Sequence, residues 1–253
     1  MKTVILCGGL GTRLSEETHL KPKPMVEIGN KPILWHIMKK YEKAGFNKFL
    51  LALGYKGNYI KDYFVNFNLR TSDFRINTLT GKVDLKTNAL EDWNVSLIDT
   101  GQNTFTGGRL LRLKDNISET FMLTYGDGVC DVNLSDLIKF HKSHGKVATV
   151  TSVRPPARFG DMKIDDNKVI KFKEKPQTET GWINGGYFIF EPQIFNYLEN
   201  DSTILEKEPL ENLSKDGELM AYKHSGFWQC MDTIRDRDYL NDKIEKGETP
   251  WLK

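Results

Sequence analysis

The chain has 253 residues, enough to bury a hydrophobic core without a disulfide or a metal to hold it together. Its 36 basic and 34 acidic residues give a formal charge of +2, which excludes a strongly basic nucleic-acid-binding protein and an acidic tail. The three cysteines, Cys7, Cys130 and Cys230, are odd in number and far apart, so we expect neither a disulfide framework nor a CxxC zinc site. No apolar run approaches the roughly 20 residues that span a bilayer, and no signal peptide is evident. We therefore expect a cytoplasmic protein without membrane or nucleic-acid partners.

Short apolar runs alternate with helical patterns along the first 153 residues. The apolar runs predict strands at 4–7, 49–53, 121–125 and 147–153, and the amphipathic stretches predict helices at 32–45, 59–64 and 134–144. Strands that are apolar throughout and separated by helices are typical of a parallel sheet covered on both faces. We therefore expect a doubly wound α/β fold with a mostly parallel, Rossmann-like sheet, whose ligands bind at the carboxyl ends of the strands.

Two later regions depart from this pattern. Residues 66–99 show polar alternation around Gly81 and no clear helix, so we interpret them as a small β excursion. From residue 154 onward the pattern is mixed, with short strands at 169–172 and 186–190 and a last helix at 235–246. We expect a single domain over 1–253, made of a core at 1–153 and a mixed α+β part at 154–253.

The loop after the first strand, Gly8 to Arg13, favours phosphate binding. Its glycines allow backbone N–H groups to face phosphate oxygens, and Arg13 and Lys23 can each hold a phosphate. The loop lacks the Lys-Ser/Thr of a Walker A motif, and Leu14 stands where the dinucleotide fingerprint needs its third glycine. The glycines alone also fit a turn with solvated charges, but the two cations favour a site for a polyphosphate.

The order of motifs along nearly the whole chain resembles the sugar-1-phosphate nucleotidylyltransferases. These motifs are GGLGTRL at 8–14, KPKPM at 21–25, TGGRL at 106–110, YGDG at 125–128, EKP at 174–176, INGG at 183–186 and GFWQ at 226–229. The longer string over 14–38 is most similar to the cytidylyl-transferring members that act on glucose 1-phosphate. The resemblance implies Mg²⁺-assisted, in-line transfer from CTP to α-D-glucose 1-phosphate, giving CDP-glucose and pyrophosphate without a covalent enzyme intermediate. It also implies a homo-oligomer, assembled with help from 66–99, in O-antigen or other surface-polysaccharide synthesis.

The resemblance also assigns roles to individual residues, and it makes 1–153 the nucleotide-binding core and 154–253 the sugar-binding and C-terminal part. Arg13 and Lys23 are the expected catalytic residues, and Asp127 and Asp232 are the expected Mg²⁺ ligands. The expected substrate-binding residues are Leu6, Cys7, Gly8, Gly9, Leu10, Gly11, Thr12, Thr104, Thr106, Gly107, Gly108, Arg109, Gly126, Lys175 and Asn184. From the residues alone, Asp127 also fits an ordinary turn, Asp232 the N-terminal cap of the last helix, and Arg109 a helix start after glycine.

Three other functions remain to be distinguished from this one. A uridylyl- or thymidylyltransferase acting on a hexose 1-phosphate would share the chemistry and differ only in the base pocket. An NAD-dependent dehydrogenase is disfavoured by Leu14. A non-catalytic sugar-nucleotide sensor would keep the glycine loop but need not retain Lys23, Asp127 and Asp232, all of which are present.

Overall fold

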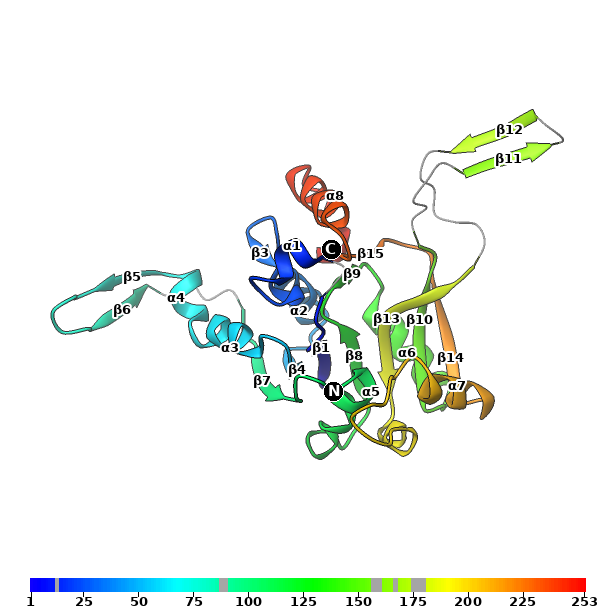
Figure 1. Ribbon diagram of the computed structural model, residues 1–253, viewed down its shortest axis with the longest axis horizontal. Helices are drawn as coiled ribbons and strands as arrows, with labels where there is room; N and C mark the ends of the chain where they lie inside the picture. Colours follow the sequence, from blue (N-terminus) through cyan, green and yellow to red (C-terminus); the bar gives the residue numbers. More distant parts are fainter. Residues whose placement is uncertain (12–13, 87–90, 156–160, 166–167, 174–180) are drawn as a thin grey trace.

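The computed structural model describes residues 1–11, 14–86, 91–155, 161–165, 168–173 and 181–253. Within these ranges, seven strands form one central sheet (Figure 1). Their order across the sheet is β14 (Leu219–His224), β10 (Ala148–Val153), β13 (Ile183–Phe190), β8 (Phe121–Tyr125), β1 (Thr3–Cys7), β4 (Lys48–Leu53) and β7 (Asn94–Asp99). All run in the same direction except β13, which is antiparallel to both neighbours. The expected mostly parallel α/β sheet is confirmed.

Alternate residues of the strands enter two separate hydrophobic cores. On β1, Ile5 and Cys7 belong to one core, while Val4 and Leu6 belong to the other. This alternation follows from the two-residue period of a strand, and it explains why a strand that is buried on both faces is apolar throughout.

Helices cover both faces of the sheet, as the doubly wound pattern predicts. The first core includes side chains from α2 (Ile33–Lys43), α3 (Gly57–Val65), α6 (Leu134–His144) and α8 (Ile234–Glu245). The second includes side chains from α5 (Thr106–Leu111) and α7 (Glu208–Lys215). None of the helices in the described ranges is long and apolar enough to cross a bilayer.

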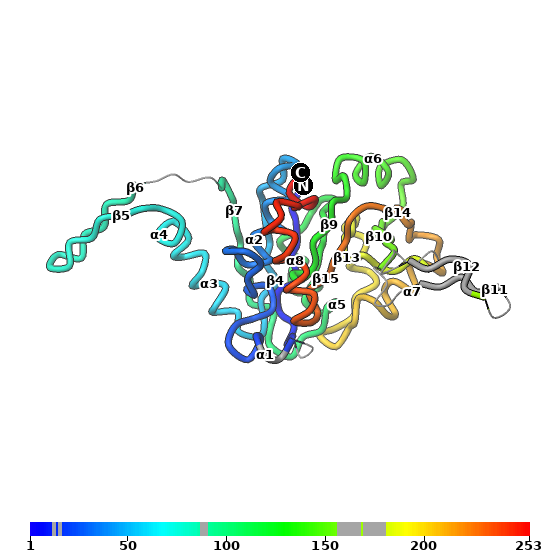
Figure 2. Tube along the Cα trace, turned by 90° about the horizontal axis from the view of Figure 1, so that it is seen from above, coloured from blue at the N-terminus to red at the C-terminus, as the bar shows by residue number. Residues whose placement is uncertain are grey.

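The region expected as a β excursion, 66–99, is only partly separate from the sheet. It contains α4 (Phe67–Thr71) and a hairpin of β5 (Asp73–Ile76) and β6 (Val83–Lys86), which reaches away from the body in Figures 1 and 2. Its last strand, β7, instead pairs in parallel with β4 at the edge of the central sheet. The sequence Asn94–Asp99 alternates because an edge strand is partly exposed, and this alternation made it resemble the excursion.

Three smaller ladders complete the described strands. They pair β2 (Glu27–Ile28) with β3 (Lys31–Pro32), β9 (Gly128–Cys130) with β15 (Trp228–Cys230), and β11 (Asp161–Asp165) with β12 (Lys168–Lys173). The long loop after β1 also has local structure that the sequence did not indicate. It contains the short helix α1 (Ser15–Thr18) and a 3₁₀ turn at Lys23–Met25, so Lys23 lies on a helical turn.

Candidate active site

A pocket opens where the parallel strands β1 and β8 end. Its walls come from the ends of these two strands, the loop after β1, the turn at Lys23, and the start of α5. The lining residues are Leu6, Cys7, Gly8, Gly9, Gly11, Lys23, Pro24, Thr104, Phe105, Thr106, Arg109, Tyr125, Gly126 and Asp127. The structure therefore brings eleven of the predicted site residues into one pocket, at the edge of the sheet where α/β proteins bind their ligands.

Lys23 lies between the two carboxylates that were expected to bind metal. Its Nζ is 2.7 Å from Oδ2 of Asp127 and 2.5 Å from Oδ1 of Asp232. All three side chains are at least 70% buried, with Lys23 only 10% exposed. Burial acts to lower the pKa of Lys23, but the charges and hydrogen bonds of Asp127 and Asp232 outweigh it, so this pKa lies above its ordinary value.

The ladder between β9 and β15 explains how residues so far apart in sequence meet. Gly128 pairs with Cys230 in register, and the N–H of Met231 donates to the carbonyl oxygen of Asp127 over 2.8 Å. This pairing places Asp232 beside Asp127. The alternative role of Asp232 as a helix cap does not hold, because α8 is capped by Thr233 in a capping box with Asp236.

The two carboxylates have the chemistry of a Mg²⁺ site. Mg²⁺ prefers oxygen ligands and is usually held in proteins by one or two carboxylates together with substrate phosphates. Asp127 and Asp232 already converge on one cationic group, the ammonium of Lys23, beside the glycine loop. The residues present therefore fit a Mg²⁺ ion, although metal binding itself stays a prediction.

The guanidinium of Arg109 makes hydrogen bonds within the protein that the sequence did not indicate. It donates to the carbonyl oxygens of Leu53, Gly101, Gln102 and Gly8 and to the hydroxyl of Thr100. The residue is only 4% exposed, and burial is the main reason that its pKa is lowered. Arg109 lines the pocket, but the hydrogen bonds of its guanidinium go to the protein itself and connect the ends of β1, β4 and β7.

The two glycines before Arg109 approach another part of the protein closely. They lie within α5, and a Cβ on Gly108 would fall 2.4 Å from the carbonyl oxygen of Asp201. The N–H groups of Gly107 and Gly108 donate to the carbonyl oxygen of Thr203. The alternative from the sequence, a helix that starts after these glycines, does not hold, because α5 begins at Thr106, and neither glycine lines the pocket.

A network of polar side chains borders the pocket on the side of β13. Because β13 runs antiparallel, it begins at the edge where β8 ends, and this places Asn184 near Tyr125. The amide of Asn184 donates to the Tyr125 hydroxyl over 3.3 Å, and that hydroxyl donates to Glu206 over 2.5 Å. Thr106 donates to the other oxygen of Glu206 over 2.6 Å. Asn184 thus reaches the pocket through Tyr125.

Sequence reasoning missed four residues of this site. Pro24, Phe105 and Tyr125 line the pocket, and Glu206 joins Tyr125 to Thr106. Pro24 and Tyr125 lie within the KPKPM and YGDG motifs, and Phe105 directly precedes TGGRL, so the motifs offered a signal for all three. Glu206 lies in no motif, and only its spatial contacts reveal it.

Other predicted residues are not placed at the pocket. Leu10 is 55% exposed and does not line it. Thr12, Arg13 and Lys175 lie outside the described residues, so their expected contacts stay predictions.

Comparison with known proteins identifies the family. Residues 2–236 match the family model described as nucleotidyl transferase. The chain belongs to the nucleotidyl transferase family. The glucose-1-phosphate cytidylyltransferase of Salmonella typhi is 51% identical over 253 residues, which cover 99% of this chain and 98% of that protein. The catalytic subunit beta of mannose-1-phosphate guanylyltransferase from Dictyostelium discoideum is 33% identical, over 95% of this chain and 63% of that protein.

A solved structure agrees with this assignment. HddC from Yersinia pseudotuberculosis is 26% identical and superimposes with a TM-score of 0.71, covering 96% of this chain and 99% of that one. The family expected from the motifs is therefore confirmed, and the pocket lined by eleven of the predicted residues lies at the carboxyl ends of β1 and β8.

Proposed function

We propose that this nucleotidyl transferase moves a cytidylyl group from CTP to α-D-glucose 1-phosphate, releasing CDP-glucose and pyrophosphate. The observation that carries the chemistry is the cluster of Lys23, Asp127 and Asp232 beside the glycine loop. The choice of CTP and glucose 1-phosphate rests on the 51% identity to the Salmonella typhi protein of that name. A sensor without catalysis would have no need of this cluster of three charged residues, two of which line the pocket.

The reaction needs positioning and charge neutralisation more than proton transfer. An oxygen of the sugar phosphate, already anionic at neutral pH, attacks the α-phosphorus of CTP in line with the departing pyrophosphate. The ammonium of Lys23 can hold a phosphate oxygen, and N–H groups of the loop from Gly8 to Gly11 can face the others. Mg²⁺ held by Asp127 and Asp232 would neutralise phosphate charge. Arg13 and Lys175 keep their expected roles on the triphosphate and on the sugar phosphate.

A turnover panel tests this proposal directly. Pyrophosphate release is measured with CTP, UTP, dTTP and GTP, each with glucose 1-phosphate and with mannose 1-phosphate, with and without Mg²⁺. We expect the highest kcat/KM with CTP and glucose 1-phosphate, and turnover only with the metal. A preference for UTP or dTTP would replace the cytidylyl assignment with a sister activity. No turnover with any pair would favour the sensor.

We further propose that the enzyme is a homo-oligomer assembled through the β5–β6 hairpin. Phe74 pairs with Leu85 and Ile76 with Val83, so these four side chains share one face of the hairpin. They are 38–51% exposed, and an isolated two-stranded hairpin is at best marginally stable in water. A second copy of the chain, covering this face, would bury it.

The expected cytoplasmic location and role in surface-polysaccharide synthesis also stay proposals, and the free thiols of all three cysteines fit a reducing compartment.

A further inference from the structure

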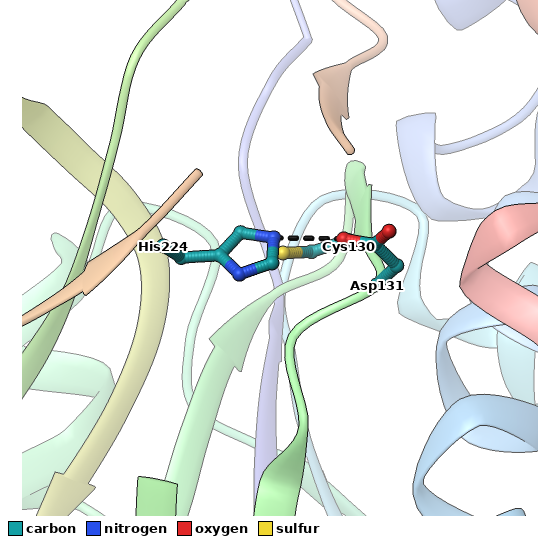
Figure 3. Close-up of side chains that lie close together, drawn as sticks. All are labelled: Cys130, Asp131 and His224. Carbon is teal, nitrogen blue, oxygen red and sulfur yellow. Dashed lines mark hydrogen bonds and ion pairs between the residues drawn. The ribbon is translucent and has the colours of Figure 1, made fainter. Parts of the chain in front are cut away.

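A second cluster of metal-binding side chains lies away from the nucleotide pocket. Cys130 and Asp131 come from the end of β9, and His224 ends β14. One possible ligand atom from each residue lies within 4.8 Å of the other two, and Figure 3 shows the three side chains converging. Nε2 of His224 is 2.8 Å from Oδ1 of Asp131. We propose that Cys130, Asp131 and His224 bind a zinc ion.

The ligand types point to zinc and not to magnesium. Thiolate, imidazole and carboxylate are the groups that bind Zn²⁺, whereas Mg²⁺ takes oxygen ligands. In a tetrahedral zinc site, neighbouring ligand atoms lie about 3 to 4 Å apart, given metal–ligand bonds of roughly 2.0 to 2.3 Å. The three groups therefore need to move by about an ångström at most to enclose the ion, with the fourth position open to water.

Burial and charge also suit such an ion. Cys130 is fully buried, while the side chains of His224 and Asp131 are 13% and 29% exposed, which leaves a path from solvent. A zinc ion with one thiolate, one carboxylate and a neutral imidazole has no net charge, so the complex avoids the cost of a buried charge. Lys40 of α2 is a cation close enough to act on both Cys130 and Asp131, and its charge works against a divalent ion, so the negative charges of the thiolate and the carboxylate are both needed.

Binding involves the exchange of one proton. The free thiol of Cys130 is protonated at neutral pH, because its pKa is raised to about 12, mainly by burial. Zn²⁺ displaces this proton, so that Cys130–SH and Zn²⁺ give a zinc thiolate and H⁺. The imidazole of His224 binds as the neutral tautomer with a lone pair on Nε2.

The position of the cluster gives the ion a structural role. The N–H of Asp131 donates to the carbonyl oxygen of Phe227 at one end of the β9–β15 ladder, and the N–H of Met231 donates to Asp127 at the other. The ion would fasten the end of β14 to β9, at the opposite end of this ladder from the carboxylates that face Lys23. Without an ion, Nε2 of His224 lies 2.8 Å from Oδ1 of Asp131 and 3.4 Å from the carbonyl oxygen of Phe227, beside a buried cysteine.

Cobalt binding to the whole protein distinguishes a metal site from a hydrogen-bonded pair beside a cysteine. Co²⁺ in a thiolate site gives a sulfur-to-metal charge-transfer absorption, and Zn²⁺ should abolish this absorption by displacing Co²⁺. We expect Cys130→Ala to lose the absorption. We expect His224→Gln to weaken Co²⁺ binding by more than the roughly tenfold that loss of a supporting contact costs. The matched control is Cys230→Ala, because the Cys230 Sγ lies 3.7 Å from Oδ2 of Asp232 and could itself bind metal at the carboxylates around Lys23.

Each outcome decides the proposal. Absorption that is lost in Cys130→Ala and retained in Cys230→Ala supports the new site. Absorption that is lost only in Cys230→Ala would place the metal at the carboxylates around Lys23 and overturn the proposal. Wild-type protein that shows no absorption with Co²⁺ would also overturn the proposal. If circular dichroism shows that Cys130→Ala is unfolded, His224→Gln decides, and unchanged Co²⁺ affinity in that variant rejects the site.

Discussion

A Cβ atom on Gly8 would lie 2.2 Å from Cζ of Arg109, far inside van der Waals contact. The carbonyl oxygen of Gly8 accepts a hydrogen bond of 2.9 Å from the same guanidinium. The first glycine of the loop therefore makes room for a buried arginine, in addition to any role toward phosphate.

This contact predicts that alanine is destabilising at Gly8 but not at the neighbouring Gly9. Gly8→Ala should lower the thermal midpoint, because the new methyl group must displace a guanidinium that holds five acceptors, and overpacking of this kind costs about 1 to 3 kcal/mol. Gly9→Ala is the matched control, since a Cβ there meets no atom within 4 Å. Equal midpoints for the two variants, measured by thermal unfolding, would contradict this prediction.

Lys23 should be required for turnover. Lys23→Ala removes a cation from the triphosphate, and loss of one such contact typically lowers kcat by about a hundredfold or more. Lys21→Ala is the control, because Lys21 lies in the same loop but its Nζ is 4.0 Å from Glu27, outside the pocket. The measurement is pyrophosphate release at saturating substrate. A near wild-type rate in Lys23→Ala would remove this residue from the mechanism.

The two carboxylates around Lys23 should set the metal requirement. Asp127→Asn and Asp232→Asn each remove a charged oxygen ligand, so we expect turnover to fall by about a hundredfold and the Mg²⁺ concentration for half-maximal rate to rise. Asp115→Asn, at an exposed position, controls for the change of surface charge. Unchanged Mg²⁺ dependence in both site variants would mean that these residues do not hold the metal.

His36 should make stability fall in mild acid. Trp251 donates to Nδ1 of His36, and Nε2 lies 3.0 Å from the carbonyl oxygen of Ile28, so the buried ring is held neutral. Burial lowers its pKa to about 4. Between about pH 6.5 and pH 4 the unfolded chain therefore binds a proton that the folded chain does not, so acid favours unfolding.

The effect of His36 can be isolated by substitution. The free energy of unfolding should drop by up to about 3 kcal/mol as the pH falls through this range. Urea unfolding of the wild type and of His36→Asn measures it, because His141 and His144 contribute equally to both proteins. Parallel pH profiles would show that His36 is not the group responsible.

The apolar face of the β5–β6 hairpin should control the oligomeric state. Phe74→Glu with Leu85→Glu places charges on that face and should shift the protein to monomers in sedimentation. The matched control changes Arg75 and Asp84 to Ser, because this pair lies on the opposite, charged face of the same hairpin. A wild-type protein that sediments as a monomer, or a double Glu variant that remains associated, would refute assembly through this face.

The sequence by itself determined the parts of this protein that depend on local order. Apolar runs located β1, β4, β8 and β10, because strand and helix periods act over a few residues. The motifs, through the family that they resemble, indicated eleven residues of the pocket. The order of motifs also indicated the family before any fold was known.

Only the tertiary structure decided which distant residues meet. Asp127 and Asp232 share Lys23 because β9 pairs with β15 in one register, and no local pattern specifies a register between strands about 100 residues apart. In the same way, Arg109 was expected to contact substrate, but its hydrogen bonds go to carbonyl groups at the ends of three strands. Long-range pairing is set by the packing of the whole sheet, so the assembled protein was needed to show how its charges are arranged.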